Sequence, residues 1–231
     1  MFVKMLFLTL LFFPLSSAEE KPLHLFILSG QSNMARLNPD ESFTPAVQKE
    51  FGADNVIVVK DAVGGMPIRR WYKKWKSSKD KEEDKGKEKK GTERARSLYD
   101  KLMKKVREAV GQKKPTTITF IWMQGESDAI ENEHAVYEDS LKGLVQQVRD
   151  DLNHKNINVI IGRLSDARVG KVGWDSIRKI QEEICEADKH WEWVDTDDLN
   201  GKKNGVHYSK EGYKTLGTRF AEKSISLVKA N

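Results

Sequence analysis

The fold is decided by residues 23–33, which read Leu-His-Leu-Phe-Ile-Leu-Ser-Gly-Gln-Ser-Asn. This stretch begins with a short apolar run, Leu23 to Ser29, and ends with Gly30 and a polar cluster. A short apolar run that stops at a glycine is typical of a buried β-strand. The stretch therefore predicts a strand whose end holds the turn Gly-Gln-Ser-Asn.

Outward from this stretch, strand-like and helix-like segments alternate along the chain. Four more apolar runs predict strands at Val56–Lys60, Thr117–Met123, Asn158–Leu164 and Trp191–Val194. Apolar residues three and four positions apart predict helices within 98–109, 137–152, 177–184 and 213–227. Nearly continuous apolar strands that alternate with amphipathic helices favour a parallel sheet covered on both faces. We predict a single α/β domain over residues 19–231.

The first eighteen residues have the composition of a signal peptide. Lys4 gives a short basic start, Met5 to Leu15 is mostly apolar, and Ser16-Ser17-Ala18 provides small residues for cleavage. The apolar run is shorter than the roughly 20 residues that span a bilayer. We expect cleavage after about Ala18 and export to the periplasm or the extracellular space, with no stable membrane span remaining. An uncleaved N-terminal anchor is the alternative.

Charge is concentrated in one segment. The 231-residue protein has 40 Lys+Arg and 35 Asp+Glu, a formal net charge of +5. Residues 76–90 contain seven basic and five acidic side chains and no large apolar residue, so we expect a solvated, mobile insertion at about 76–91. Its net charge of +2 and the loss of Lys4 leave the rest of the domain nearly neutral. We therefore expect no nucleic-acid partner.

Four polar or glycine-rich clusters are expected at one edge of the sheet. They are Gly30–Met34, Gly64-Gly65, Gln124–Asp128 and Asn204–His207. The first three follow predicted strands directly, and the fourth lies between the fifth strand and the last helix. In open parallel sheets, ligands bind in the crevice at the carboxyl ends of the strands. The sequence therefore predicts a site at this edge.

Three of these motifs resemble those of the SGNH (GDSL-like) hydrolase superfamily. The motifs are Gly30-Gln-Ser-Asn-Met34, Trp122-Met-Gln-Gly-Glu-Ser-Asp128 and Gly205-Val-His-Tyr-Ser209. They are most similar to its branch of sialate O-acetylesterases and acetylxylan esterase-like carbohydrate esterases. This resemblance implies a flavodoxin-like three-layer α/β/α sandwich with about five parallel strands. It also implies metal-independent hydrolysis of a small acyl ester, usually an acetyl group on a sugar.

An ester hydrolase needs a nucleophile and hydrogen-bond donors for the oxyanion. Ser32 lies in a turn from strand to helix, where its hydroxyl can project over the sheet edge, although it could instead serve as a helix N-cap. For oxyanion or substrate binding, the candidates are Gly65, Gly64, Gln124 and Asn33. A glycine brings its backbone N–H close to a substrate because it has no side chain. The amide of Gln124 is a candidate third donor.

His207 is the candidate general base, because an unperturbed imidazole exchanges protons near neutral pH. The superfamily usually places an aspartate three residues before this histidine, and this protein has Asn204 there. We predict Glu126 as the replacement acid. Asp128 and the group Asp195, Asp197 and Asp198 are alternatives, as is a Ser–His dyad oriented by a carbonyl. Glu126 could equally hold the Ser32 turn in place by hydrogen bonds.

The leading interpretation is a secreted serine esterase that deacetylates a carbohydrate or polysaccharide through an acyl-enzyme on Ser32. It needs no cofactor and no metal. A lipid or thioester hydrolase of the same superfamily is a second interpretation. A non-catalytic carbohydrate-binding protein, favoured by Asn204 and by Trp71 and Trp75, is a third. A metal-dependent deacetylase is the weakest, because the histidines and aspartates show no ligand spacing. The oligomeric state is not predicted.

Overall fold

The computed structural model describes residues 21–79 and 97–230. The predicted signal peptide, and residues 80–91 of the predicted insertion, lie outside the described residues. Five strands form one parallel sheet in the order β2-β1-β3-β4-β5. Their bounds are β1 His24–Gly30, β2 Val56–Ala62, β3 Thr117–Met123, β4 Ile157–Gly162 and β5 Trp191–Val194. The flavodoxin-like α/β fold is confirmed.

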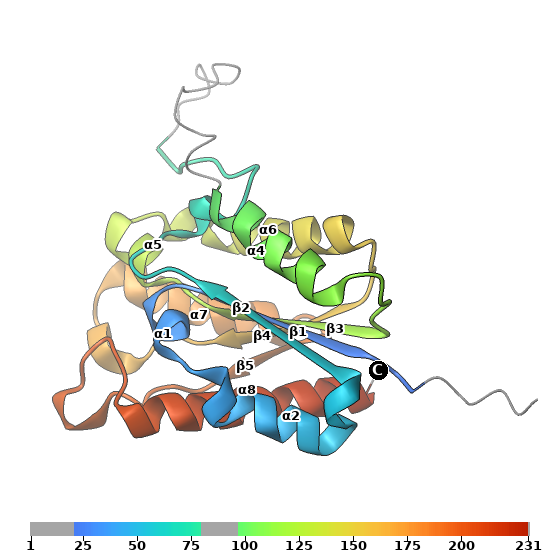
Figure 1. The fold of residues 1–231 in the computed structure, drawn as a ribbon. Helices are drawn as coiled ribbons and strands as arrows, with labels where there is room; N and C mark the ends of the chain where they lie inside the picture. Colours follow the sequence, from blue (N-terminus) through green and yellow to red (C-terminus); the bar gives the residue numbers. More distant parts are fainter. Residues whose placement is uncertain (1–20, 80–96, 231) are drawn as a thin grey trace, which may run out of the picture.

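Helices cover both faces of this sheet (Figure 1). Their bounds are α1 Ser32–Arg36, α2 Phe43–Phe51, α4 Ser97–Val110, α5 Glu126–Glu131, α6 Tyr137–Leu152, α7 Val172–Glu186 and α8 Lys210–Ala230. Side chains alternate between the two faces of a strand. In β1, Leu25 and Ile27 pack in the core beneath α4, α6 and α7, whereas Phe26 and Leu28 pack in the core beneath α2 and α8. This alternation produces the three layers.

Strand β4 and helix α2 are among the elements that differ from the prediction. Strand β4 ends at Gly162 rather than Leu164, because the Leu164 N–H donates to Oε1 of Gln181 on α7 at 2.9 Å instead of to a strand. Helix α2 was not predicted, although Phe43 and Val47 are four residues apart and both buried. Its Pro45 lies in the first turn, where the missing N–H costs nothing.

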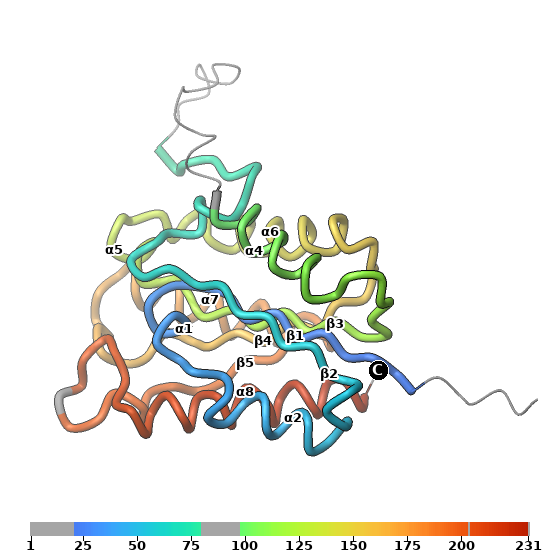
Figure 2. Tube along the Cα trace, viewed as in Figure 1, coloured from blue at the N-terminus to red at the C-terminus, as the bar shows by residue number. Residues whose placement is uncertain are grey.

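The topology brings the predicted site together. Strand β1 lies between β2 and β3, and the order of the strands runs outward from β1 in both directions, so the sheet has its switch point between β1 and β3. Figure 2 shows that the segments after β1, β3 and β5 turn at the same edge of the sheet. Among the described residues, no helix is both long and apolar enough to cross a membrane.

Candidate active site

Ser32 is the first residue of α1, directly after a tight turn at the end of β1. The turn begins at Gly30, whose φ of 141° is a conformation that other residues rarely adopt. A Cβ at Gly30 would lie 2.0 Å from the carbonyl oxygen of Met123. The N–H of Gln31 donates to that same oxygen at 2.9 Å. The absence of a side chain at residue 30 therefore lets the end of β1 pack against the end of β3.

His207 lies beside Ser32, although 175 positions separate them in sequence. Its Nε2 is 3.0 Å from Oγ of Ser32. Partial burial, and then the positive charge of Arg36, hold the pKa of His207 below its ordinary value. A depressed pKa keeps the imidazole neutral near pH 7, which is the state that can accept the Ser32 proton.

Asn204, at the position of the expected acid, is turned toward another residue. Its Oδ1 accepts a hydrogen bond of 2.6 Å from Nδ2 of Asn200. Asn204 itself has a φ of 42°, in the left-handed region that asparagine tolerates. Within the described parts of the protein, no hydrogen bond joins Nδ1 of His207 to a carboxylate or a carbonyl. Among the residues that the structure describes, the Ser–His pair therefore has no third member bonded to Nδ1.

The acidic residues after β5 pair with arginines instead. Asp198 forms a bidentate ion pair with Arg219, and Asp197 binds Arg178 and Arg163. Asp195 also binds Arg163. These contacts occupy Asp198, Asp197 and Asp195, and among the described residues no hydrogen bond joins any of the three to His207. They anchor the segment that leads from β5 to His207.

Glu126, the predicted acid, contacts the Ser32 turn rather than His207. It is buried, and its Oε1 accepts a hydrogen bond of 3.0 Å from Nδ2 of Asn33. Burial raises the pKa of Glu126 to about 7. Among the described residues no hydrogen bond joins Glu126 to His207, so Glu126 matches the alternative role of holding the turn in place. The prediction of Glu126 as the orienting acid finds no hydrogen bond to support it.

Asn33 ties three segments together. Besides Glu126, its Nδ2 donates to the carbonyl oxygen of Val206 at 3.0 Å, and its Oδ1 accepts from the hydroxyl of Tyr213 at 3.0 Å. The side chain is buried and all its polar atoms are bonded within the protein. These internal bonds give no support to the prediction that Asn33 binds substrate. Its contacts fix the residue after Ser32 to the residue before His207.

Gln124 is likewise a structural residue here. Its Nε2 donates to Oδ2 of Asp128 at 2.5 Å, to Oε1 of Gln31 at 3.1 Å and to the carbonyl oxygen of Met66 at 3.3 Å. An amide nitrogen has two hydrogens, so these partners leave none for a substrate. These bonds give no support to the prediction of Gln124 as a third oxyanion donor.

Asp128 bonds to the loop that contains Gly64 and Gly65. Its Oδ2 also accepts from the N–H of Ile68 at 2.9 Å. Burial raises the pKa of Asp128 to about 6. Together with the bond from Gln124 to Met66, this contact positions residues 64–68 next to the Ser32 turn. Among the described residues no hydrogen bond joins Asp128 to His207, so the prediction of Asp128 as the orienting acid has no support in the structure.

Gly64 and Gly65 remain as oxyanion candidates. A Cβ at Gly64 would lie 3.6 Å from Cβ of Ser32, which places this glycine against the candidate nucleophile. Gly65 has a φ of 68°, and no described atom lies within 4 Å of the Cβ position. The place that a side chain would take at Gly65 is therefore open.

Two residues of the site were missed from the sequence. Gln31 accepts at Oε1 from Gln124 and from the N–H of Ser127 at 3.2 Å, which joins the two turns. Tyr213 was predicted only as part of the apolar stripe of the last helix, yet its hydroxyl bonds Asn33. For Gln31, its place beside Ser32 was the available signal; nothing in the spacing of Tyr213 indicated a polar role.

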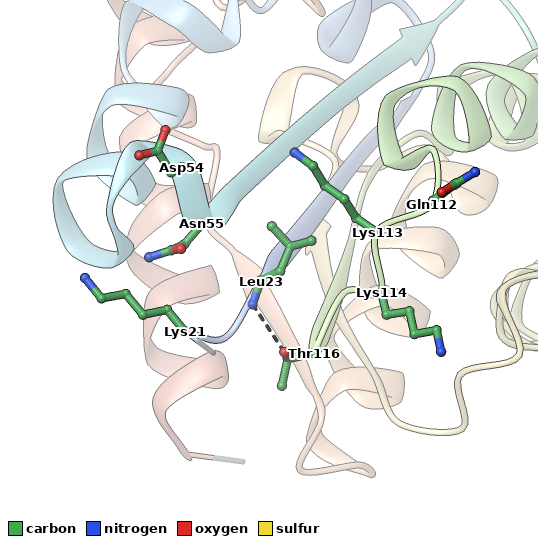
Figure 3. Close-up of a pocket in the computed structure, with 8 residues that line it drawn as sticks. All are labelled: Lys21, Leu23, Asp54, Asn55, Gln112, Lys113, Lys114 and Thr116. Carbon is green, nitrogen blue, oxygen red and sulfur yellow. Dashed lines mark hydrogen bonds between the residues drawn. The ribbon is translucent and has the colours of Figure 1, made fainter. Parts of the chain in front are cut away.

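A cavity of about 500 Å³ lies at the opposite edge of the sheet (Figure 3). It is lined by Lys21, Leu23, Asp54, Asn55, Gln112, Lys113, Lys114 and Thr116. These residues lie near the starts of β1 and β3, so the cavity contains none of the predicted site residues. Among the described residues, no group of three or more His, Cys, Asp or Glu could hold a metal ion.

Comparison with known proteins identifies the family. A family model described as carbohydrate esterase, sialic acid-specific acetylesterase, matches residues 35–226. The protein belongs to this family of carbohydrate esterases. It is a carboxylic ester hydrolase with the SGNH fold, as the sequence motifs predicted, and its family acts on carbohydrates.

Individual relatives agree with the family. A probable carbohydrate esterase of Arabidopsis thaliana is 24% identical over 219 residues, which cover 89% of this chain and 69% of that protein. A solved Arabidopsis thaliana structure has a TM-score of 0.61 at 21% identity, covering 89% of this chain and 98% of the other. A carbohydrate acetylesterase from Xanthomonas citri has a TM-score of 0.63 at 15% identity, covering 90% of this chain and 57% of the other. The structure of NanS has a TM-score of 0.62 at 13% identity, covering 91% and 99%.

Proposed function

We propose that this carbohydrate esterase removes acetyl or other small acyl groups from a sugar through an acyl-enzyme on Ser32. The observation that supports this mechanism is the distance of 3.0 Å between Nε2 of His207 and Oγ of Ser32. This is within the reach of direct proton transfer from a nucleophile to its base. A pKa of His207 below its ordinary value also favours the neutral base.

In the first half of the reaction, Oγ of Ser32 attacks the ester carbonyl while its proton moves to Nε2 of His207. The backbone N–H groups of Ser32 and of Gly64 or Gly65 stabilise the oxyanion. The tetrahedral intermediate collapses, and His207 returns its proton to the departing sugar oxygen. In the second half, His207 takes a proton from water, the hydroxide attacks the acyl-enzyme, and Ser32 leaves with the proton from His207. The products are the free sugar hydroxyl and a carboxylic acid.

Export is part of this proposal. Residues 1–18 have the basic start, apolar stretch and small-residue cleavage site of a signal peptide. A mature protein that begins near residue 19 would meet acetylated polysaccharide outside the cytoplasm. Sequencing of the N-terminus of protein recovered from the culture medium or periplasm tests this expectation; an N-terminus at Met1 in the exported fraction would contradict it.

A non-catalytic carbohydrate-binding protein is the second candidate, and Asn204 is the observation that favours it. A serine hydrolase that loses its orienting carboxylate can lose about 10⁴ in turnover. The contact between Ser32 and His207 favours the esterase over this candidate, because a binding protein has no need for a base beside a serine hydroxyl.

Hydrolysis of p-nitrophenyl acetate and p-nitrophenyl octanoate separates these functions. We expect the mature protein to turn over acetate faster than octanoate, and Ser32→Ala and His207→Ala each to abolish the activity. A preference for octanoate would support the lipid-hydrolase alternative. A wild type no faster than the two variants would remove the catalytic assignment and leave sugar binding as the next measurement.

A further inference from the structure

The loop that leads to His207 contains two Asn-Gly pairs, Asn200-Gly201 and Asn204-Gly205. An asparagine followed by glycine is the sequence most prone to spontaneous deamidation, because glycine leaves the next backbone nitrogen unhindered. The same chemistry is therefore available twice within six residues. The surroundings of the Asn200 and Asn204 side chains differ, and this difference decides which of the two is the better site for deamidation.

Asn200 is protected by its surroundings. Its side chain is 6% exposed, and its Nδ2 donates to Oδ1 of Asp166 at 2.8 Å as well as to Asn204. Loss of this nitrogen as ammonia would leave Oδ1 of the half-buried Asp166 without its donor, at a cost in free energy. The native contacts therefore oppose deamidation of Asn200.

Asn204 has the opposite surroundings. Its side chain is exposed, and among the described residues its own nitrogen donates no hydrogen bond. The bond from Asn200 to its Oδ1 polarises the Cγ carbonyl and faces the oxygen on which negative charge develops when Cγ is attacked. At Gly205, the nearest atom to an added Cβ is the carbonyl oxygen of His207 at 3.9 Å, so this turn is open.

We propose that Asn204 is a deamidation site, and that its conversion to aspartate supplies the carboxylate missing beside His207. The backbone nitrogen of Gly205 gives its proton to solvent and bonds to Cγ of Asn204. The Cγ–Nδ2 bond breaks, and ammonia leaves with a proton from water. Water then opens the resulting succinimide: cleavage of the N–Cγ bond gives aspartate, and cleavage of the original peptide bond gives isoaspartate.

The two products have opposite effects on the site. Aspartate keeps the backbone unchanged and places a carboxylate three residues before His207, at the end of the turn Gly201–Lys203. A carboxylate hydrogen-bonded to Nδ1 fixes the tautomer of a catalytic histidine and stabilises the imidazolium that forms. Isoaspartate adds a methylene to the backbone and displaces His207 from Ser32. This consequence for activity rests on the proposed esterase function, whereas the modification itself does not.

The test is peptide mapping by mass spectrometry of the purified full-length protein, incubated at pH 8 and sampled over days. We expect the replacement of NH₂ by OH at Asn204, with Asn200 unchanged. Gly205→Ala is the matched control: its side chain has room, and it should slow the reaction by hindering the attacking nitrogen. The proposal that Asn204 is a deamidation site would be wrong if Asn204 stayed intact while Asn200 reacted. It would also be wrong if Gly205→Ala left the rate of deamidation unchanged.

Kinetics of Asn204→Asp test the consequence. We expect its kcat/KM on p-nitrophenyl acetate to exceed that of freshly purified wild type by about tenfold or more. A variant no faster than wild type would overturn the activating role. If wild type and Asn204→Asp both lack activity, the proposed function itself fails, and the mapping result still decides the modification site.

Discussion

Glu126→Gln should change how the stability of the protein depends on pH. Glu126 is buried, its Oε1 accepts from Asn33, and its Oε2 has no hydrogen-bond partner in the described structure. Burial raises its pKa from 4.5 to about 7 in the folded state. The folded protein therefore binds the Glu126 proton more tightly than the unfolded protein does. Glutamine has nearly the same shape and does not titrate, so it removes this contribution.

The magnitude follows from the linkage between protonation and folding. A raised carboxyl pKa means that stability is greatest below the unfolded pKa and is lost as the pH rises through the folded pKa. For a shift from 4.5 to about 7, the loss between pH 5 and pH 8 is about 2.5 kcal/mol. Between pH 5 and pH 8, the free energy of unfolding of the wild type should therefore fall by this amount relative to that of Glu126→Gln. Asp128 is present in both proteins, so the part of its contribution that does not depend on Glu126 cancels in the difference; its charge is also one of the causes that raise the pKa of Glu126.

Urea unfolding followed by tryptophan fluorescence measures this difference at pH 5, 6, 7 and 8. The free energy of unfolding of Glu126→Gln minus that of wild type should rise steadily with pH. Asp198→Asn is the control: the ion pair with Arg219 holds the pKa of Asp198 below 3.8, so its difference from wild type should stay constant over this range. Parallel curves for Glu126→Gln and wild type would refute an elevated pKa at this buried carboxyl.

Three further predictions concern the site. Arg36→Gln should raise the pKa on the acidic side of the kcat/KM profile, because Arg36 lowers the pKa of His207; an unchanged profile would refute this coupling. Gly30→Ala should unfold at a markedly lower urea concentration, since its Cβ would lie 2.0 Å from the Met123 carbonyl oxygen, whereas Gly205→Ala, with 3.9 Å of room, should not. Asn33→Ala should lower both kcat and stability, the latter by about 1–3 kcal/mol from the bonds that it removes, and a normal kcat would contradict its positioning role.

The sequence predicted the strands and the functional edge well, because each strand is marked by an apolar pattern within its own short segment. Apolar runs placed all five strands to within about two residues, and glycines after the strands indicated the functional edge. The pairing of Ser32 with His207 followed from the motifs, and the structure brings the two side chains within hydrogen-bond distance. Their roles as nucleophile and base remain proposals.

The buried polar contacts could not be predicted in the same way. Asp197 and Asp198 looked like candidate acids because the arginines that bind them, Arg178 and Arg219, come from other helices. Gln124 looked like a donor for substrate because the sequence does not show that Asp128 and Gln31 compete for its hydrogens. A motif places a residue at an edge, whereas the direction of its side chain depends on partners distant in sequence.

The central claim is that Ser32 is the nucleophile and His207 its base. Labelling with a fluorophosphonate, followed by peptide mass spectrometry, tests it directly, because the reagent bonds covalently to an activated serine. We predict one adduct on Ser32 in the wild type and none in His207→Ala. An adduct on a different serine, or an unmodified Ser32 in protein that hydrolyses p-nitrophenyl acetate, would contradict the mechanism.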